Sequence, residues 1–157
     1  MALKLYVETS VWSAVLRDSQ PDIQGYSRDF LQHASSQGMT LYVSPTVGKE
    51  MGQAPEPLGR RLLSLLDEWG AVVIRPTSEV RALANAFVER GIIPLRYSAD
   101  AEHLAFAIVG GADAIVSWNL DHIVKLKTKM AVRVLAVERG YRLIDVVTPL
   151  EVLEGVD

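Results

Sequence analysis

Three carboxylic acids and one amide in this sequence have the side-chain types and the positions of a metal site. Glu8 ends an apolar run, Glu50 follows a second one, Asp100 opens an apolar helical stretch, and Asn119 ends a further short apolar run. Because the carboxyl ends of parallel strands meet at one edge of a sheet, we expect these side chains to converge there. Carboxylate oxygens are ligands that Mg²⁺ and Mn²⁺ prefer, and substrate phosphate can complete the shell. We therefore predict Glu8, Glu50 and Asp100 as metal ligands and Asn119 as a fourth catalytic residue.

The elements that must position these residues alternate between strand-like and helix-like patterns. A first strand ends at Glu8, and short β-branched runs predict further strands, buried on both faces, at residues 41–44, 71–75, 114–118 and 143–147. Apolar spacings of three and four predict helices over residues 23–34, 58–69 and 80–88, with a short helix around residues 46–51. Residues 98–111 are apolar nearly all round and predict a central buried helix. The order predicts an α/β fold in a single domain over residues 1–157, with a mostly parallel central sheet flanked by helices on both faces.

Composition excludes several other kinds of chemistry. The chain has 157 residues, of which 49% are hydrophobic and 22% charged, as in a globular protein with a substantial core. It has no cysteine, which rules out disulfides, a thiolate zinc site and a cysteine nucleophile. The sequence shows no long apolar stretch and no signal-peptide pattern at its start, so we expect a cytoplasmic protein without a membrane partner.

Positive charge is concentrated in one segment of an otherwise acidic chain. Between His122 and Arg142 there are six basic residues and one acid, hence 6 − 1 = +5, whereas the whole chain carries −3. We predict that Lys125, Lys127, Lys129 and Arg133 bind the backbone of a nucleic acid. The alternative is a solvated helix face with no such role.

Four motifs, in this order and spacing, resemble those of PIN-domain proteins, including VapC-type toxins. They are Val7-Glu8-Thr9-Ser10-Val11-Trp12, Ser44-Pro45 through Glu50-Met51, Asp100-Ala101-Glu102-His103-Leu104-Ala105, and Ile115-Val116-Ser117-Trp118-Asn119-Leu120-Asp121-His122-Ile123. The resemblance covers nearly the whole chain. It implies a PIN-like fold, a metal-dependent endoribonuclease using Mg²⁺ or Mn²⁺, an RNA substrate, a homodimer and an antitoxin protein as partner. The alternative is a catalytically silent PIN-like module that binds RNA or a protein.

Two positions depart from the motifs of that family. The first acid is ordinarily Asp, and Glu8 is one methylene longer. The fourth acid is commonly Asp, and Asn119 supplies an oxygen without a charge. Asn119 either weakens the site or is the normal residue of a PIN-like subgroup with this Ser-Trp-Asn pattern, and Asp121 is a candidate substitute acid.

Polar neighbours of these residues have a functional and a structural interpretation. Thr9 and Ser10 either cap the helix that follows the first strand or orient Glu8. His122 either contacts phosphate or ends a loop. His103, three residues after Asp100, either shares the metal or packs at the surface of its helix.

Overall fold

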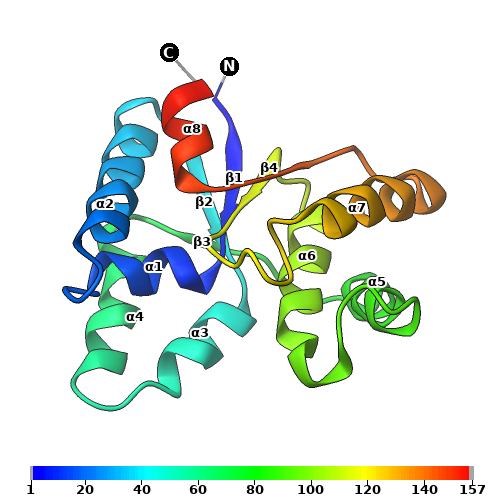
Figure 1. The fold of residues 1–157 in the computed structure, drawn as a ribbon, viewed down its shortest axis with the longest axis horizontal. Coiled ribbons are helices and arrows are strands. Elements are labelled where there is room, and N and C mark those ends of the chain that lie inside the picture. Colours follow the sequence, from blue (N-terminus) through cyan, green and yellow to red (C-terminus); the bar gives the residue numbers. More distant parts are fainter. Residues whose placement is uncertain (1, 156–157) are drawn as a thin grey trace.

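The computed structural model describes residues 2–155, which form an α/β fold around one parallel sheet (Figure 1). The five strands of these residues are β1 (Lys4–Val7), β2 (Thr40–Val43), β3 (Val72–Val73), β4 (Ala114–Val116) and β5 (Asp145–Val147). They lie in the order β3-β2-β1-β4-β5, and every neighbouring pair is parallel. The predicted α/β fold with a parallel sheet is therefore confirmed.

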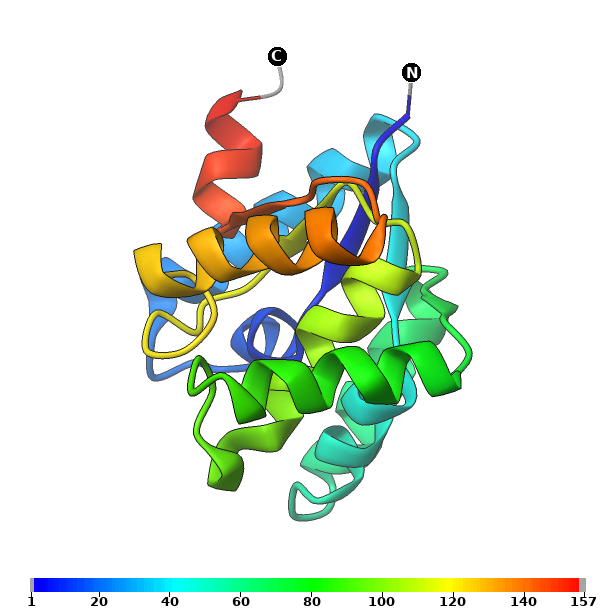
Figure 2. The same ribbon diagram turned by 90° about the vertical axis from the view of Figure 1, so that its right-hand side faces the viewer.

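Helices cover both faces of the sheet. They are α1 (Thr9–Val15), α2 (Pro21–Ser36), α3 (Pro45–Gly52), α4 (Leu58–Glu68), α5 (Ser78–Glu89), α6 (Ser98–Val109), α7 (Leu126–Arg139) and α8 (Pro149–Gly155), with a 3-10 turn η1 (Leu95–Tyr97) before α6. Helices α2 and α8 lie on one face of the sheet, and α5, α6 and α7 lie on the other (Figures 1 and 2). Within residues 2–155, no helix is both long and apolar enough to cross a membrane.

Strand β1 is central because its side chains are apolar on both sides. Residues Leu5–Val7 are at most 1% exposed, and β2 and β4 flank the strand. Val7 is in register with Val116, and the backbone N–H of Glu8 donates to the Val116 carbonyl at 3.0 Å. The chain leaves β1 at Glu8 and leaves β4 at Ser117. These two residues are therefore neighbours at the carboxyl edge of the sheet.

The position of β3 in the sheet differs from the predicted one. The sequence predicted a strand at residues 71–75 that is buried on both faces, but β3 is an edge strand whose Val72 and Val73 are 46% and 57% exposed. A run of β-branched residues favours a strand whatever its place in the sheet. The strand predicted over residues 143–147 as buried on both faces is likewise an edge strand, because β5 ends the sheet and Asp145 and the preceding Leu143 are exposed. Local sequence therefore predicted both strands but not their positions at the edges.

Helix α6 is the buried helix that the sequence predicted. Its buried residues are Ala101, His103, Leu104, Ala105, Phe106, Ala107 and Ile108. Asp100 lies in its first turn, which faces the carboxyl edge of the sheet. The helix thus brings Asp100 close to the ends of β1 and β4.

Candidate metal centre

A cleft of about 660 Å³ opens at the carboxyl edge of the sheet. Its lining includes all the residues predicted to be catalytic or supporting: Glu8, Thr9, Ser10, Glu50, Asp100, Asn119, Asp121 and His122. They come from the start of α1, from α3, from the first turn of α6 and from the loop after β4. The fold thus brings together side chains that are far apart in the sequence.

Glu8 is 4% exposed, and both of its carboxylate oxygens accept hydrogen bonds. The hydroxyls of Ser10 and Ser117 donate to Oε1, and the backbone N–H of Ser10 donates to Oε2 at 3.1 Å. Glu8 is therefore the N-cap of α1, where the partial positive charge of the helix terminus favours a carboxylate. The acid caps the helix, and the Ser10 hydroxyl orients the acid.

Glu50 is fixed by two donors, one of which belongs to a buried chain of hydrogen bonds. Thr9 Oγ1 donates to Glu50 Oε1 at 2.7 Å, and His103 Nε2 lies 2.6 Å from the same oxygen. On the other side of the ring, His103 Nδ1 lies 2.7 Å from Tyr6 Oη, which lies 2.7 Å from Ser44 Oγ. Because a carboxylate only accepts, His103 Nε2 carries a proton and donates to Glu50. The chain of hydrogen bonds connects the core to the cleft.

His103 is buried, so of its two interpretations the one that placed it at the helix surface is wrong. It is 0% exposed because α6 is enclosed nearly all round, so its imidazole needs internal partners. Burial lowers the pKa of His103, but the hydrogen bond to Glu50 and the charges of Glu8, Glu50 and Asp100 outweigh it, so the pKa is raised. Burial likewise raises the pKa of Glu50, but the hydrogen bond and charge of His103, with the Thr9 bond, lower it overall. The pair is therefore stabilised in its charged form.

Asp100 is paired with a histidine of its own. His122 Nδ1 lies 2.9 Å from Asp100 Oδ2, and the two side chains are 21% and 13% exposed. Burial, followed by the charge of Glu8, raises the pKa of Asp100, while His103 and hydrogen bonds from His122 and Asn119 offset only part of this. Burial and the neighbouring Glu8 carboxylate thus disfavour the charged form of Asp100, which a bound cation would favour.

Asn119 holds the loop after β4. Its Oδ1 accepts the backbone N–H of His122 at 3.0 Å, and its own N–H donates to Ser117 Oγ at 2.9 Å. Such a local side-chain-to-backbone bond is typical of Asn and Asp. The turn places His122 beside Asp100, while Asp121 is exposed at the rim of the cleft.

The donor atoms have the spacing and chemistry of a divalent-cation site. One oxygen of Glu8, one oxygen of Glu50 and a ring nitrogen of His103 lie within 4.8 Å of one another. Ligands about 2.1 Å from a common ion lie up to about 4.2 Å apart, so this cluster needs little movement to hold one. While His103 Nε2 carries a proton it cannot act as a ligand, which leaves the carboxylates of Glu8 and Glu50 as the donors of this cluster. Asp100 lines the same cleft but is not part of the cluster.

The residues predicted to bind nucleic acid do not line the cleft. Lys125 is the N-cap of α7, and Lys127, Lys129 and Arg133 lie on that helix. Arg17 lines the cleft instead and was not predicted. It lies beyond Leu16, the C-cap of α1, in a loop whose path the helical pattern of the sequence does not give.

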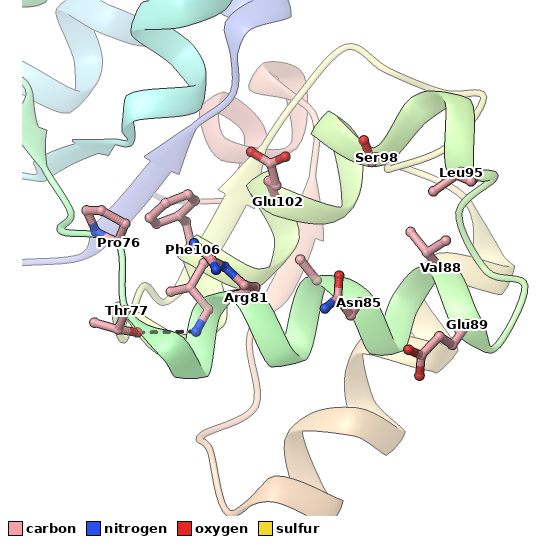
Figure 3. A pocket seen from close by; sticks show the side chains of 12 residues that line it. Pro76, Thr77, Arg81, Asn85, Val88, Glu89, Leu95, Ser98, Glu102 and Phe106 are labelled. Carbon is pink, nitrogen blue, oxygen red and sulfur yellow. Dashed lines mark hydrogen bonds between the residues drawn. The ribbon is translucent and has the colours of Figure 1, made fainter.

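A second cavity, of about 450 Å³, lies between α5 and α6 (Figure 3). Arg81, Asn85 and Glu102 line it together with apolar side chains. Glu102 accepts a hydrogen bond from Thr46 Oγ1 at 2.7 Å, which ties α6 to the helix that carries Glu50. None of the predicted site residues lines this cavity.

Comparison with known proteins bears on the fold. No protein-family model and no curated protein matches the sequence. The solved structure of VapBC2 from Rickettsia felis, bound to a DNA fragment from their promoter, is similar, with a TM-score of 0.55 over 93% of this chain and 98% of that chain. The fold is PIN-like. Because the two sequences are only 11% identical, the likeness shows a shared fold and confirms that part of the prediction.

Proposed function

We propose that this protein is a metal-dependent endoribonuclease and the toxin component of a toxin–antitoxin pair. The observation that carries the proposal is the gathering of the Glu8, Glu50 and Asp100 carboxylates in one cleft of a PIN-like fold. These three residues would hold Mg²⁺ or Mn²⁺. The resemblance of the four sequence motifs to PIN-domain proteins supports the same reaction class.

A divalent cation bound there would polarise the scissile phosphate and lower the pKa of an attacking water. The chain's own hydroxyl groups hold two of the carboxylates in place for this task. Ser10 and Ser117 donate to Glu8, and Thr9 donates to Glu50. Such preorganisation means that little side-chain movement is needed at the moment of reaction.

The loop after β4 supplies the remaining groups of the proposed site. Asn119 holds the loop and, through it, the position of His122, whose ring is exposed enough to reach a phosphate. Asp121 at the rim provides a further acid. We propose that His122 and Asn119 orient the phosphate or the attacking water.

The RNA backbone would run from the cleft along the basic side chains beside it. Arg17 lies in the cleft, and Lys125, Lys127, Lys129 and Arg133 lie on or next to α7. Positive charge outside the acidic cleft attracts phosphates without competing for the cation.

The proposed partners are an antitoxin and a second copy of this chain. The similar solved structure is described as VapBC2 bound to a promoter fragment, which supports a partner protein. A homodimer follows from the resemblance to PIN-domain toxins, and analytical ultracentrifugation tests it. We also propose a cytoplasmic location, which follows from the same resemblance to PIN-domain toxins.

One observation favours the silent module as a second candidate. In the described residues, each of Glu8, Glu50 and Asp100 already accepts at least one hydrogen bond from a hydroxyl or a histidine. A cleft that is stable without a cation could bind RNA without cutting it.

Cleavage of a panel of structured RNAs in Mn²⁺, Mg²⁺ or EDTA distinguishes the two candidates. We expect cleavage only with a cation, and a loss of roughly 100-fold or more in Glu50→Gln. The matched control is Glu68→Gln, at an exposed glutamate of α4, which should cleave like the wild type. Equal background from all proteins, with RNA binding intact, would support the silent module.

A further inference from the structure

Helix α7 has two apolar faces, and residues 2–155 cover only one of them. The covered face consists of Thr128, Val132, Leu135 and Ala136. The opposite face carries large exposed side chains, namely Leu126 at 73%, Met130 at 59%, Val134 at 51% and Val137 at 69% exposure. These positions, i, i+4, i+8 and i+11, follow one side of a helix. We call these four residues the α7 seam.

An apolar stripe on the outer side of a helix indicates a binding surface. A surface helix of a globular protein ordinarily places polar side chains there. Scattered apolar residues at a surface are normal, but a contiguous exposed group marks an interaction site. Helix α7 lies at the outside of the layer that contains α5 and α6 (Figure 2). Its outer side is therefore open to a partner.

Positive charge borders the α7 seam. At 100° per residue, Lys129 and Arg133 lie on one side of the seam and Lys127 on the other. The acid of the helix, Glu138, lies 2.7 Å from Arg90, which neutralises it. The surface thus has an apolar centre and a basic border.

We propose that the α7 seam binds an amphipathic helix with acidic flanks, supplied by a different protein. A stripe about one side chain wide corresponds to the contact line of a helix pair, and flanking charges then select the partner. Asp and Glu beside the partner's apolar residues would meet Lys127, Lys129 and Arg133. A second copy of this chain would place basic borders against each other. An RNA backbone on Lys127, Lys129 and Arg133 would leave the four aliphatic side chains uncovered, so a helix bound at the seam would compete with RNA for these basic residues only. The inference is independent of nuclease activity.

Fluorescence anisotropy with two synthetic peptides tests the proposal. Both peptides carry leucines at i, i+4, i+7 and i+11; one has glutamates at the flanking positions and the other has lysines. We expect the glutamate peptide to bind at least about tenfold more tightly than the lysine peptide. Met130→Asp should weaken glutamate-peptide binding by about tenfold or more, because it places a carboxylate at the centre of the seam. Leu63→Asp, at an exposed leucine of α4, is the matched control and should not change binding.

Several outcomes would overturn the proposal. They are equal binding of the two peptides, no binding of either, or binding that Met130→Asp leaves unchanged. Two further assays examine other occupants of the seam. A dimer in ultracentrifugation that Met130→Asp dissociates would assign the seam to a second copy. Binding to phosphatidylserine vesicles that Met130→Asp abolishes would assign it to a membrane surface.

Discussion

His103 Nε2 lies 2.6 Å from Glu50 Oε1 and 3.8 Å from Glu8 Oε2. The imidazole thus lies between two carboxylates that would repel each other if they were bare. On the other side of the ring, Nδ1 of His103 forms a hydrogen bond with the hydroxyl of Tyr6. In the metal-free protein, the positive charge beside Glu8 and Glu50 therefore comes from the buried His103.

Replacing His103 by alanine should destabilise the metal-free protein by about 2–4 kcal/mol. The change leaves a buried tyrosine hydroxyl without one of its partners and two carboxylates without their counter-charge. Urea unfolding in EDTA measures the effect. His33→Ala, at a histidine outside the cleft, should cost much less, and equal losses in the two variants would contradict the role given to His103.

The free energy of unfolding in EDTA should fall as the pH rises above about 6.5. A histidine with a raised folded pKa contributes its full stabilisation below the unfolded pKa of about 6.5 and loses it as the pH rises through the folded pKa. Glu50 has the opposite sign, because its lowered pKa gives stabilisation that is lost as the pH falls through the folded value. His103→Gln should flatten both limbs, because the hydrogen bond and the charge of His103 are also the main causes of the lowered pKa of Glu50. An unchanged alkaline limb in this variant would show that other groups cause it.

Asn119→Asp should lower the metal-free melting temperature and increase the stabilisation by Mn²⁺. The new carboxylate adds repulsion near Asp100, whose pKa is already raised, and a cation offsets that repulsion. Differential scanning calorimetry with and without Mn²⁺ measures both effects. The matched control is Asn85→Asp on α5, which lies outside the cleft. Identical behaviour of the two variants would remove Asn119 from the site.

Neutralising Lys125, Lys127 and Lys129 together should weaken RNA binding and flatten its salt dependence. Each lost phosphate contact on single-stranded RNA should reduce the slope of log K against log salt by roughly 0.7. Binding should be measured with Glu50→Gln as the background, so that cleavage does not interfere. Neutralising Arg60 and Arg61 on α4 is the control. An unchanged slope in the lysine variant would mean that these lysines form only a solvated helix face.

Much of the fold was predictable because local patterns fix its elements. Uninterrupted β-branched runs alternate with helical stripes, which leaves few arrangements other than a parallel sheet with crossover helices. Glu8, Glu50 and Asp100 could be placed at one edge for the same reason, since the ends of parallel strands share that edge. The exposure of Val72 and Val73 was not predictable, because strand order depends on distant contacts.

The histidine pairings and the α7 seam were beyond the reach of sequence patterns. The i, i+3 spacing of Asp100 and His103 does not say which side of a buried helix faces the cleft. The partners of His103, Tyr6 and Glu50, come from other elements that only the tertiary structure brings near. Helix α7 is apolar on two sides, so its pattern alone does not reveal which side is covered.

A crystal soaked in Mn²⁺ and measured at the manganese absorption edge tests the central claim most directly. We predict an anomalous peak in the cleft, within roughly 2–2.5 Å of carboxylate oxygens of Glu8, Glu50 and Asp100. Asp100→Asn crystals should show a weaker peak or none. A cleft without a peak, with Glu8 and Glu50 still bound to their serines, threonine and histidine, would contradict the account of this protein as a metal-dependent nuclease.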